Sequence, residues 1–238
     1  MKLLLINGNT DPAITARVLQ HAQAGLPRLG LSAELHAVTA RFGARYIASR
    51  ASAAIAGHAV LEALAEHGAG MDGIIIACFG DPGLDAAKEL AGVPLVGMAE
   101  ASLTVARAAE RRIGFITGGA AWVPMLEEFC LSRGLPAGQV LVRAVAPDGA
   151  RIAADPEGAV AELAAAVRGA AADGAEAVVL GGAGLAGLAP AVAAASGVAV
   201  LDSLDCALLA VMQAAVPVRA EGVRTVGLSA GLEGWMAG

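Results

Sequence analysis

The chain of 238 residues has few aromatic side chains, few basic ones and no basic run that follows a helix. Aromatic residues make up only 3% of it, although 57% of the residues are hydrophobic and many of these are alanine. This composition favours closely packed helices and an enclosed core over broad aromatic interfaces. Lysine and arginine number 16 against 22 acidic residues, for a net charge of −6. We therefore expect no nucleic-acid partner.

Long hydrophobic runs and paired cysteines are also missing. The opening MKLLLINGNT is interrupted at Asn7, and no segment approaches the roughly 18 apolar residues that a membrane span requires. Cys78, Cys130 and Cys206 lie far apart without metal-ligand spacing, and their odd number leaves no complete disulfide framework. We expect a cytoplasmic protein with no membrane partner and no metal site. Core packing is the simpler interpretation of Cys130 and Cys206.

Short apolar runs alternate with longer helical patterns along the chain. This alternation predicts an α/β fold with mainly parallel sheets, in which ligands bind beyond the carboxyl ends of the strands. Asp11-Pro12 and Asp155-Pro156 each combine a capping residue with a proline at the first helical position, so each predicts a helix start. The predicted strands are Leu3–Ile6, Ala33–Val38, Gly73–Ala77, Pro94–Val96, Ile113–Thr117, Val140–Ala144, Ala177–Leu180, Val198–Leu201 and Thr225–Leu228.

The thiol of Cys78 stands at the predicted carboxyl end of a strand, in the stretch ACFGDPGL. A buried free cysteine is most often a small hydrophobe in the core. Here the glycines and the proline predict a tight turn into a helix, whose N–H groups and dipole would lower the thiol pKa and supply a thiolate. Asp81 is predicted to cap that same helix.

A second stretch repeats this pattern in the later half of the chain. Val178-Val179-Leu180 runs into GGAGLAGL, where Gly182 takes the position of Cys78. The echo suggests two similar halves whose strand ends face each other across a cleft. The stretch also contains a GxGxxG pattern after a strand, with Asp202 at the end of the next strand, as in dinucleotide-binding motifs. Pro190 interrupts the expected crossover helix, so nicotinamide binding is kept only as an alternative.

Two polar turns follow predicted strands. One holds Asn7, Asn9 and Thr10, and the other begins at Thr117 and Gly118. Residues of this kind commonly form turns and helix caps. Because both turns lie at carboxyl ends and carry N–H and hydroxyl donors, they are also candidates to hold a carboxylate or ring carbonyl and to stabilise an enolate.

Together these motifs resemble the aspartate/glutamate/hydantoin racemase superfamily, and within it the hydantoin and allantoin racemases. The resemblance rests on INGNT, ARYIASR, CFGDPGL, ITGGAAWVPML and LGGAGLAGL, of which ACFGDPGL is the most specific. It implies two pseudo-symmetric α/β domains with the active site in the cleft between them, no cofactor, and two cysteines on opposite faces of the substrate. Following the family's layout, residues 1–97 plus 207–238 form the first domain and residues 98–206 the second.

Carried over by position, Cys78 matches the family's first catalytic cysteine, and the place of the second falls on Gly182. The resemblance also places the polar turns and the neighbours of these two positions at the substrate. The predicted substrate-binding residues are Asn7, Asn9, Thr10, Phe79, Gly80, Thr117, Gly118, Ala183 and Gly184.

The resemblance thus implies a cofactor-independent racemase of the hydantoin or amino-acid-derivative type, acting on a small molecule with a carboxylate or ring carbonyl. A homo-oligomer is compatible with it. Because one thiol is missing, a single-cysteine decarboxylase of the arylmalonate type is the main alternative. An NAD-binding oxidoreductase and a non-catalytic small-molecule binder are further alternatives.

Overall fold

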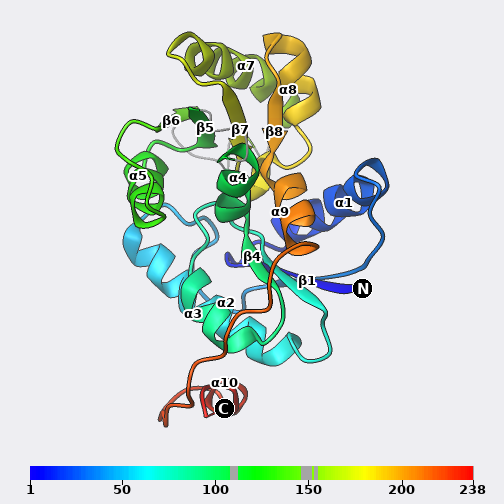
Figure 1. The fold of residues 1–238 in the computed structure, drawn as a ribbon, viewed down its shortest axis with the longest axis vertical. Helices are drawn as coiled ribbons and strands as arrows, with labels where there is room; N and C mark the ends of the chain where they lie inside the picture. Colours follow the sequence, from blue (N-terminus) through cyan, green and yellow to red (C-terminus); the bar gives the residue numbers. More distant parts are fainter. Residues whose placement is uncertain (108–111, 146–151, 153–154, 238) are drawn as a thin grey trace.

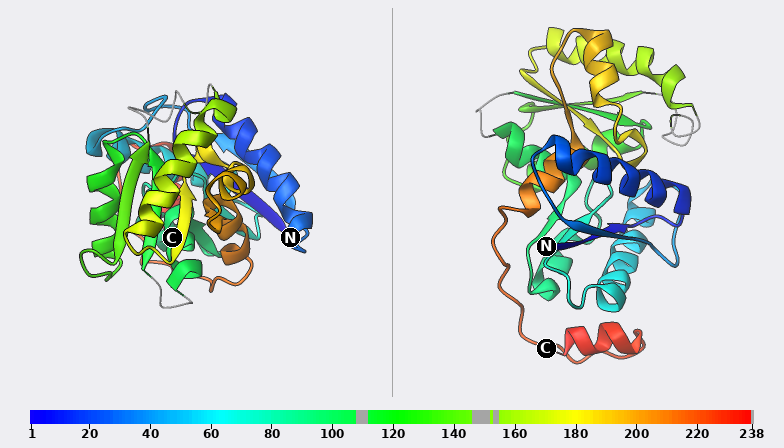
Figure 2. Two further views of the ribbon diagram at one scale, coloured as in Figure 1. Left: turned by 90° about the horizontal axis from the view of Figure 1, so that it is seen from above. Right: turned by 90° about the vertical axis from the view of Figure 1, so that its right-hand side faces the viewer.

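Two four-stranded parallel sheets, one above the other, form the framework of the computed structural model (Figure 1, Figure 2). The structure describes residues 1–107, 112–145, 152 and 155–237. The first sheet has the order β2-β1-β3-β4 and the second the order β6-β5-β7-β8, so the predicted α/β fold with parallel sheets is confirmed. The strands are β1 (Lys2–Asn7), β2 (Glu34–Thr39), β3 (Gly73–Ile76), β4 (Leu95–Gly97), β5 (Ile113–Gly118), β6 (Val140–Val145), β7 (Ala177–Gly181) and β8 (Val200–Asp202).

The inner strands are continuous apolar runs because they are covered on both faces, as is usual in parallel sheets. Leu3–Ile6 of β1 and Ile74–Ile76 of β3 are at most 1% exposed. Eight of the nine predicted strands are present. Asp11 and Asp155 cap the two helices that they were predicted to start.

Helices pack on both sheets and also fill the junction between them. The helix α4 follows the last strand of the first sheet and α9 follows the last strand of the second, and the two pack side by side in the middle of the molecule (Figure 1). Among the described residues, no helix is both long and apolar enough to cross a bilayer. The helices are α1 (Pro12–Arg28), α2 (Arg50–His67), α3 (Leu84–Ala91), α4 (Met98–Arg107), α5 (Trp122–Ser132), α7 (Pro156–Ala172), α8 (Ala189–Ser196), α9 (Ser203–Val211) and α10 (Ala230–Met236), with a short 3₁₀ helix, η1, at Ala183–Leu185.

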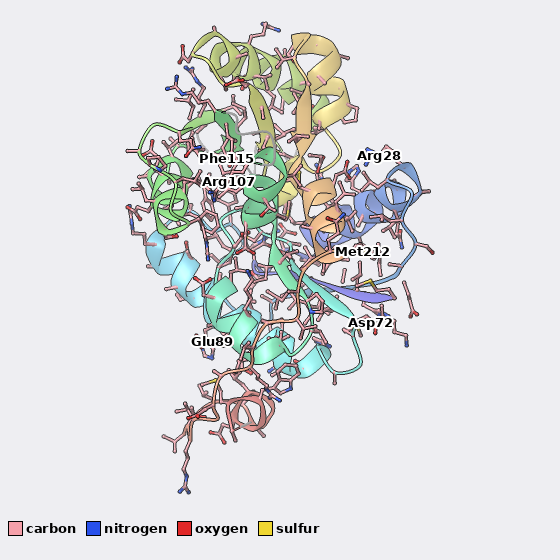
Figure 3. The ribbon with its side chains drawn as sticks, in the orientation of Figure 1. Arg28, Asp72, Glu89, Arg107, Phe115 and Met212 are labelled. Atoms are coloured by element: carbon pink, nitrogen blue, oxygen red, sulfur yellow. The ribbon has the colours of Figure 1, made fainter. Side chains whose placement is uncertain are left out.

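The main hydrophobic core continues from one sheet to the other. Phe115 of β5 and Trp122 of α5 belong to the same cluster of buried residues as Leu5 and Ile75 of the first sheet. Figure 3 shows Phe115 close to the junction between the two sheets. A second, smaller cluster lies under α7 and α8. The junction between the sheets is therefore part of the packed interior, and this fixes how the strand ends face each other.

The ninth predicted strand, Thr225–Leu228, is wrong. Residues 213–229 run along the surface as an irregular segment that leads to α10 (Figure 2). Ala220 N donates to Glu89 O of α3 (3.0 Å), near the position labelled in Figure 3. Val226 is 88% exposed. The segment contacts α3 and α10 and pairs with no sheet edge in the described structure, so its apolar pattern does not produce a strand.

Candidate active site

The carboxyl ends of four strands, two from each sheet, open onto one cavity of about 310 Å³. The first sheet contributes the ends of β1 and β3, and the second contributes the ends of β5 and β7. The first turns of α1, the loop between β2 and α2, and the start of α5 complete the walls. The lining residues are Asn9, Asp11, Ala13, Ile14, Arg17, Arg45, Tyr46, Ile47, Cys78, Phe79, Thr117, Gly118, Trp122, Gly182, Ala183, Gly184 and Leu185.

Most of the sequence-predicted site residues meet at this cavity, and three do not line it. Asn7, Thr10 and Gly80 are not among the lining residues: Asn7 accepts from Asn9 N, Thr10 N donates to Ala44 O, and Gly80 is covered by the Trp122 ring. The predicted residues that line the cavity are Asn9, Cys78, Phe79, Thr117, Gly118, Gly182, Ala183 and Gly184.

Asn9 is held in one orientation by its neighbours. Its Oδ1 accepts hydrogen bonds from Asn7 Nδ2 (3.0 Å) and Asp11 N (2.8 Å), and its backbone N–H donates to Asn7 Oδ1 (3.1 Å). Asn7 is only 1% exposed and also donates to Thr15 Oγ1 (3.0 Å), so it is fixed in turn. The carbonyl of the Asn9 amide is thus occupied, and its N–H groups are the part left for a ligand.

Thr117 and Gly118 bring the second sheet to the opposite wall. Thr117 is 4% exposed and is one of the residues that line the cavity. The carbonyl of Gly118 accepts a hydrogen bond from Tyr46 Oη of the first half (2.8 Å). Thr10 N donates to Ala44 O (3.1 Å), which holds the loop that carries Tyr46. Polar groups from both halves therefore converge on one space.

Several lining residues were not singled out from the sequence. Arg17 lies on α1 and its Nη1 donates to Gly184 O of the other half (3.3 Å). Arg45 forms an ion pair with Asp11 at the rim of the cavity (3.0 Å), and the Arg45 side chain is mostly exposed. These side chains lie on helices and loops with no motif of their own. Arg45 and Tyr46 lie in ARYIASR, one of the stretches that carry the family resemblance, but nothing in that stretch itself predicts a role for them.

The predicted thiolate at Cys78 is wrong for this structure. The thiol is 7% exposed, and burial raises its pKa to about 12, with the nearby Asp81 carboxylate adding to the rise. The helix α3 begins only at Leu84, with Gly83 at its cap. The helix therefore starts six residues after the thiol. Cys78 rests as a neutral thiol, which is a proton donor.

Asp81 does not cap α3 as predicted, because its side chain turns the other way. Its carboxylate accepts hydrogen bonds from Ala99 N (2.9 Å) and Glu100 N (2.7 Å), the first turn of α4. Burial raises the pKa of this carboxyl group to about 7, while the two N–H donors oppose that rise. Asp81 thus joins the Cys78 turn to the helix that enters the junction between the halves.

The Gly182 turn has the same pair of backbone hydrogen bonds as the Cys78 turn. Leu185 N donates to Gly182 O (2.9 Å) and Leu188 N to Leu185 O (3.1 Å), which matches Asp81 N to Cys78 O (3.0 Å) and Leu84 N to Asp81 O (3.1 Å). Gly182 has φ of +146°, a conformation that L side chains rarely adopt. The second half therefore presents a matching turn to the cavity with no acid or base at this position.

Aromatic rings from each half pack on glycines of the other half. The Phe79 ring covers Gly181 and the Trp122 ring covers Gly80, so closely that a methyl group on either glycine would overlap the ring. Phe79 also meets Phe115 edge to face, with ring centroids 4.9 Å apart. These contacts fix the distance between the two turns.

The dinucleotide-binding alternative loses its two sequence features. Residues after Gly182 form the short η1 rather than the start of a long helix. Asp202 accepts hydrogen bonds from Gly187 N (2.8 Å) and Leu204 N (2.9 Å), so its carboxylate is used within the fold. No group of three or more His, Cys, Asp or Glu side chains gathers as a metal site in the described part of the chain. Cys130 and Cys206 are buried away from this cavity, as predicted.

The chain matches known racemases over most of its length. The family model for Asp/Glu/Hydantoin racemase matches residues 3–211. Hydantoin racemase of Rhizobium meliloti is 35% identical over 213 residues, which cover 87% of this chain and 86% of that protein. Hydantoin racemase of Pseudomonas sp. (strain NS671) is 32% identical over 206 residues, covering 86% of this chain and 82% of that protein.

A solved structure shares the whole fold. Allantoin racemase from Klebsiella pneumoniae superposes with a TM-score of 0.85 at 28% sequence identity, over 98% of this chain and 98% of that chain. The two sheets and the helices around them are thus a known architecture.

Proposed function

This chain belongs to the Asp/Glu/hydantoin racemase family and is an isomerase, and we propose that it racemises a hydantoin-type ring by proton transfer through Cys78. The observation that carries the proposal is the cavity itself. It brings a neutral thiol on one strand end together with hydrogen-bond donors on two others. The substrate is a small molecule with a carbonyl next to the carbon that loses its proton.

The proposed reaction moves protons and no other group. On the Gly182 side a base takes the proton from ring carbon 5, and the electron pair moves onto the neighbouring carbonyl to give an enolate. Cys78 then gives its S–H proton to the opposite face of the carbon, and the proton held by the base restores the thiol. For the other enantiomer the steps run in reverse. General acid–base groups of this kind contribute about 10²- to 10⁴-fold to a rate.

Asn9 and Thr117 are proposed to hold the oxygen that becomes negative. The Asn9 carbonyl accepts from Asn7 and Asp11, which orients the amide, and its N–H groups have no partner in the described structure. The Thr117 hydroxyl comes from the facing sheet. Donors that are fixed before the reaction stabilise a developing charge without rearranging, and each is worth about 10²- to 10³-fold.

No side chain at position 182 can act as the base on the second face of the substrate. Gly182 carries no side chain, and Leu185 is the neighbour that a methyl group there would meet, at 3.4 Å. Water admitted beside Gly182 is the proposed base. Water is a weak base, so turnover should be slower than with a second thiol.

A second candidate is a reaction that needs only one protonation. Loss of carbon dioxide from an arylmalonate leaves an enediolate, and one thiol then protonates it. The neutral Cys78 and the missing thiol at Gly182 favour this candidate.

The test incubates the protein in D₂O with an enantiopure 5-benzylhydantoin, allantoin, an amino acid and an arylmalonate. Deuterium uptake, optical rotation and CO₂ release are followed, with a protein-free reaction to subtract spontaneous racemisation. Deuterium uptake with loss of rotation on either hydantoin supports the racemase. Uptake without loss of rotation indicates one-sided exchange, and CO₂ release indicates the decarboxylase. No isotope uptake and no CO₂ release would overturn both proposals.

A further inference from the structure

The Cys78 turn contains a strained residue. Asp81 has φ of +49°, and it is the one non-glycine residue with positive φ in the described structure. Two turn hydrogen bonds hold it, from its own N–H to Cys78 O and from Leu84 N–H to its carbonyl. Backbone strain of this kind persists only where the surroundings enforce it, and it is common at functional sites.

The Asp81 carboxylate is enclosed by the start of α4. It accepts from Ala99 N and Glu100 N, and a methyl group at Gly97 would overlap it. Helix α4 therefore receives its N-terminal cap from a residue 18 positions earlier in the chain, on the turn that carries the thiol.

The second half caps its equivalent helix differently. Asp202 stands at the end of β8, in register with the position that Gly97 occupies in β4, and it caps α9 locally. The turn position that matches Asp81 is Leu185. Capping the helix therefore does not require a carboxylate on the turn. Only the half that carries the thiol places one there.

We propose that Asp81 is a positioning residue for Cys78: its two hydrogen bonds to the start of α4 tie the turn that carries the thiol to that helix. The Asp81 carboxylate also raises the pKa of the Cys78 thiol. This inference rests on the proposed role of Cys78. A negative charge next to a thiol opposes its ionisation. Fixing the turn keeps the S–H at a constant place in the cavity, and small displacements of a reacting group are costly.

Charged groups surround Asp81 on three helices. Glu100 of α4 faces it and pairs with Lys88 of α3 (2.6 Å). Arg133, which follows α5, pairs with Asp85 of α3 (2.8 Å) and lies 3.8 Å from Glu100. The Arg133 guanidinium favours the Asp81 carboxylate and Glu100 opposes it. Asp81 thus lies where the thiol's turn meets α3, α4 and the end of α5.

The test compares Asp81→Asn with Asp202→Asn, which removes the negative charge of the equivalent capping residue in the half without a thiol. Brief iodoacetamide pulses at several pH values, followed by mass mapping, give the reactivity of each cysteine. Each pKa unit lost by the thiol raises its thiolate fraction about tenfold below the pKa. We expect Asp81→Asn to speed labelling of Cys78 relative to Cys130, the thiol that neither variant adjoins. We also expect kcat for deuterium uptake to fall by about 10- to 100-fold with KM within about twofold, because the turn is loosened. Asp202→Asn should do neither.

A second variant keeps the proposal testable if Asp81→Asn folds poorly. The exchange Asp81→Gly with Gly97→Asp moves the carboxylate to the strand end, as in the other half, and places glycine at the positive φ. We expect thermal stability to recover while the faster labelling of Cys78 and the low kcat persist. Recovery of both, or an equal effect of Asp202→Asn on Cys78, would show that Asp81 is only a cap. If the wild type exchanges no substrate but Cys78 labelling still responds to Asp81, the proposed function fails and the link between the two residues stands.

Discussion

The Cys78 turn and the Gly182 turn share their turn hydrogen bonds, but they differ in backbone conformation at three matching positions and in several side chains. Both follow the inner strand of a sheet, both carry the same pair of turn hydrogen bonds, and Gly83 and Gly187 both have positive φ at matching places. One turn carries a thiol and a buried carboxylate, and the other carries glycine and leucine. The repeated fold therefore supplies two equivalent positions at the cavity, and the chemistry depends on which residues occupy them.

Glycine is required at different positions of the two turns for different physical reasons. Gly80 and Gly181 lie under aromatic rings from the opposite half, which leave no room for a side chain, and Gly80 also has φ of +116°. Gly182 has ordinary space around it, and its restriction is the backbone conformation. Packing between the halves thus restricts Gly80 and Gly181, whereas backbone conformation restricts Gly182. The substitutions below change the two turns one at a time.

The largest expected effect is on the turn with the thiol. Cys78→Ala should lower deuterium uptake and racemisation by about 10²- to 10⁴-fold, because the proposed proton donor is lost. Isotope uptake measured by mass spectrometry checks this. Cys206→Ala is the matched control, since that thiol is 2% exposed and does not line the cavity. A Cys78→Ala protein that keeps more than about a tenth of the activity would exclude the thiol as the proton donor.

Adding a thiol to the other turn should make the two halves alike. Gly182→Cys should cost about 1–3 kcal/mol of stability, because φ of +146° is unfavourable for a side chain. Its Cβ would lie 3.4 Å from Leu185 Cγ, an ordinary contact, so the variant should still fold. Racemisation of an enantiopure hydantoin should rise on the order of 10²-fold, because a thiol replaces water on the second face.

Gly182→Ala separates strain from chemistry in that experiment, because it carries the same backbone cost without a thiol. The gain should also vanish when Gly182→Cys is combined with Cys78→Ala. Optical rotation and thermal unfolding are measured for all three proteins. A folded Gly182→Cys variant that gains nothing would mean that the two positions do not face the same substrate carbon.

The sequence predicts the frame of the site better than its details. Parallel strands buried on both faces appear as continuous apolar runs, so the positions of Cys78, Thr117 and Gly182 at strand ends follow from local pattern. Asp81 shows the limit, since its partners at Ala99 and Glu100 are set by how α4 lies against the turn. The direction of the Cys78 pKa shift was missed for the same reason: burial is a property of the assembled halves.

Contacts between the halves could not be predicted at all. Tyr46 and Gly118 are 72 residues apart, and no motif links them. The domain limits at residues 97 and 206 stay a prediction, as do the cytoplasmic location and a homo-oligomer. The strand expected at Thr225–Leu228 shows that an apolar run needs a free sheet edge within reach.

The Asp81 carboxyl group should make the free energy of unfolding depend on pH. The pKa of Asp81 is about 7 in the folded chain and near 3.8 when unfolded, so folding favours its protonated form. Its contribution is complete below the unfolded pKa and is lost as pH rises toward 7. The free energy of unfolding of the wild type, minus that of Asp81→Asn, should therefore decrease as pH rises from about 3.8 to about 7. The decrease should be at most about 1.4 kcal/mol per pH unit. Urea unfolding at several pH values checks this, and a difference that rises with pH would contradict it.

The smallest effect concerns the hydrogen bond that joins the halves beside the cavity. Tyr46 Oη donates to Gly118 O (2.8 Å), so Tyr46→Phe removes this link between the halves and keeps the ring in the wall. The loss should be about 0.5–1.5 kcal/mol of stability. KM should rise a few-fold while kcat changes less, because a looser wall weakens binding before it affects the thiol turn. Arg41→Gln is the control on the same loop, since Arg41 pairs with Glu66 at the surface (3.2 Å) with its side chain 66% exposed. Equal effects of both changes would assign the loss to the loop as a whole, whereas a Tyr46→Phe protein with wild-type KM would mean that the cavity wall does not depend on this link between the halves.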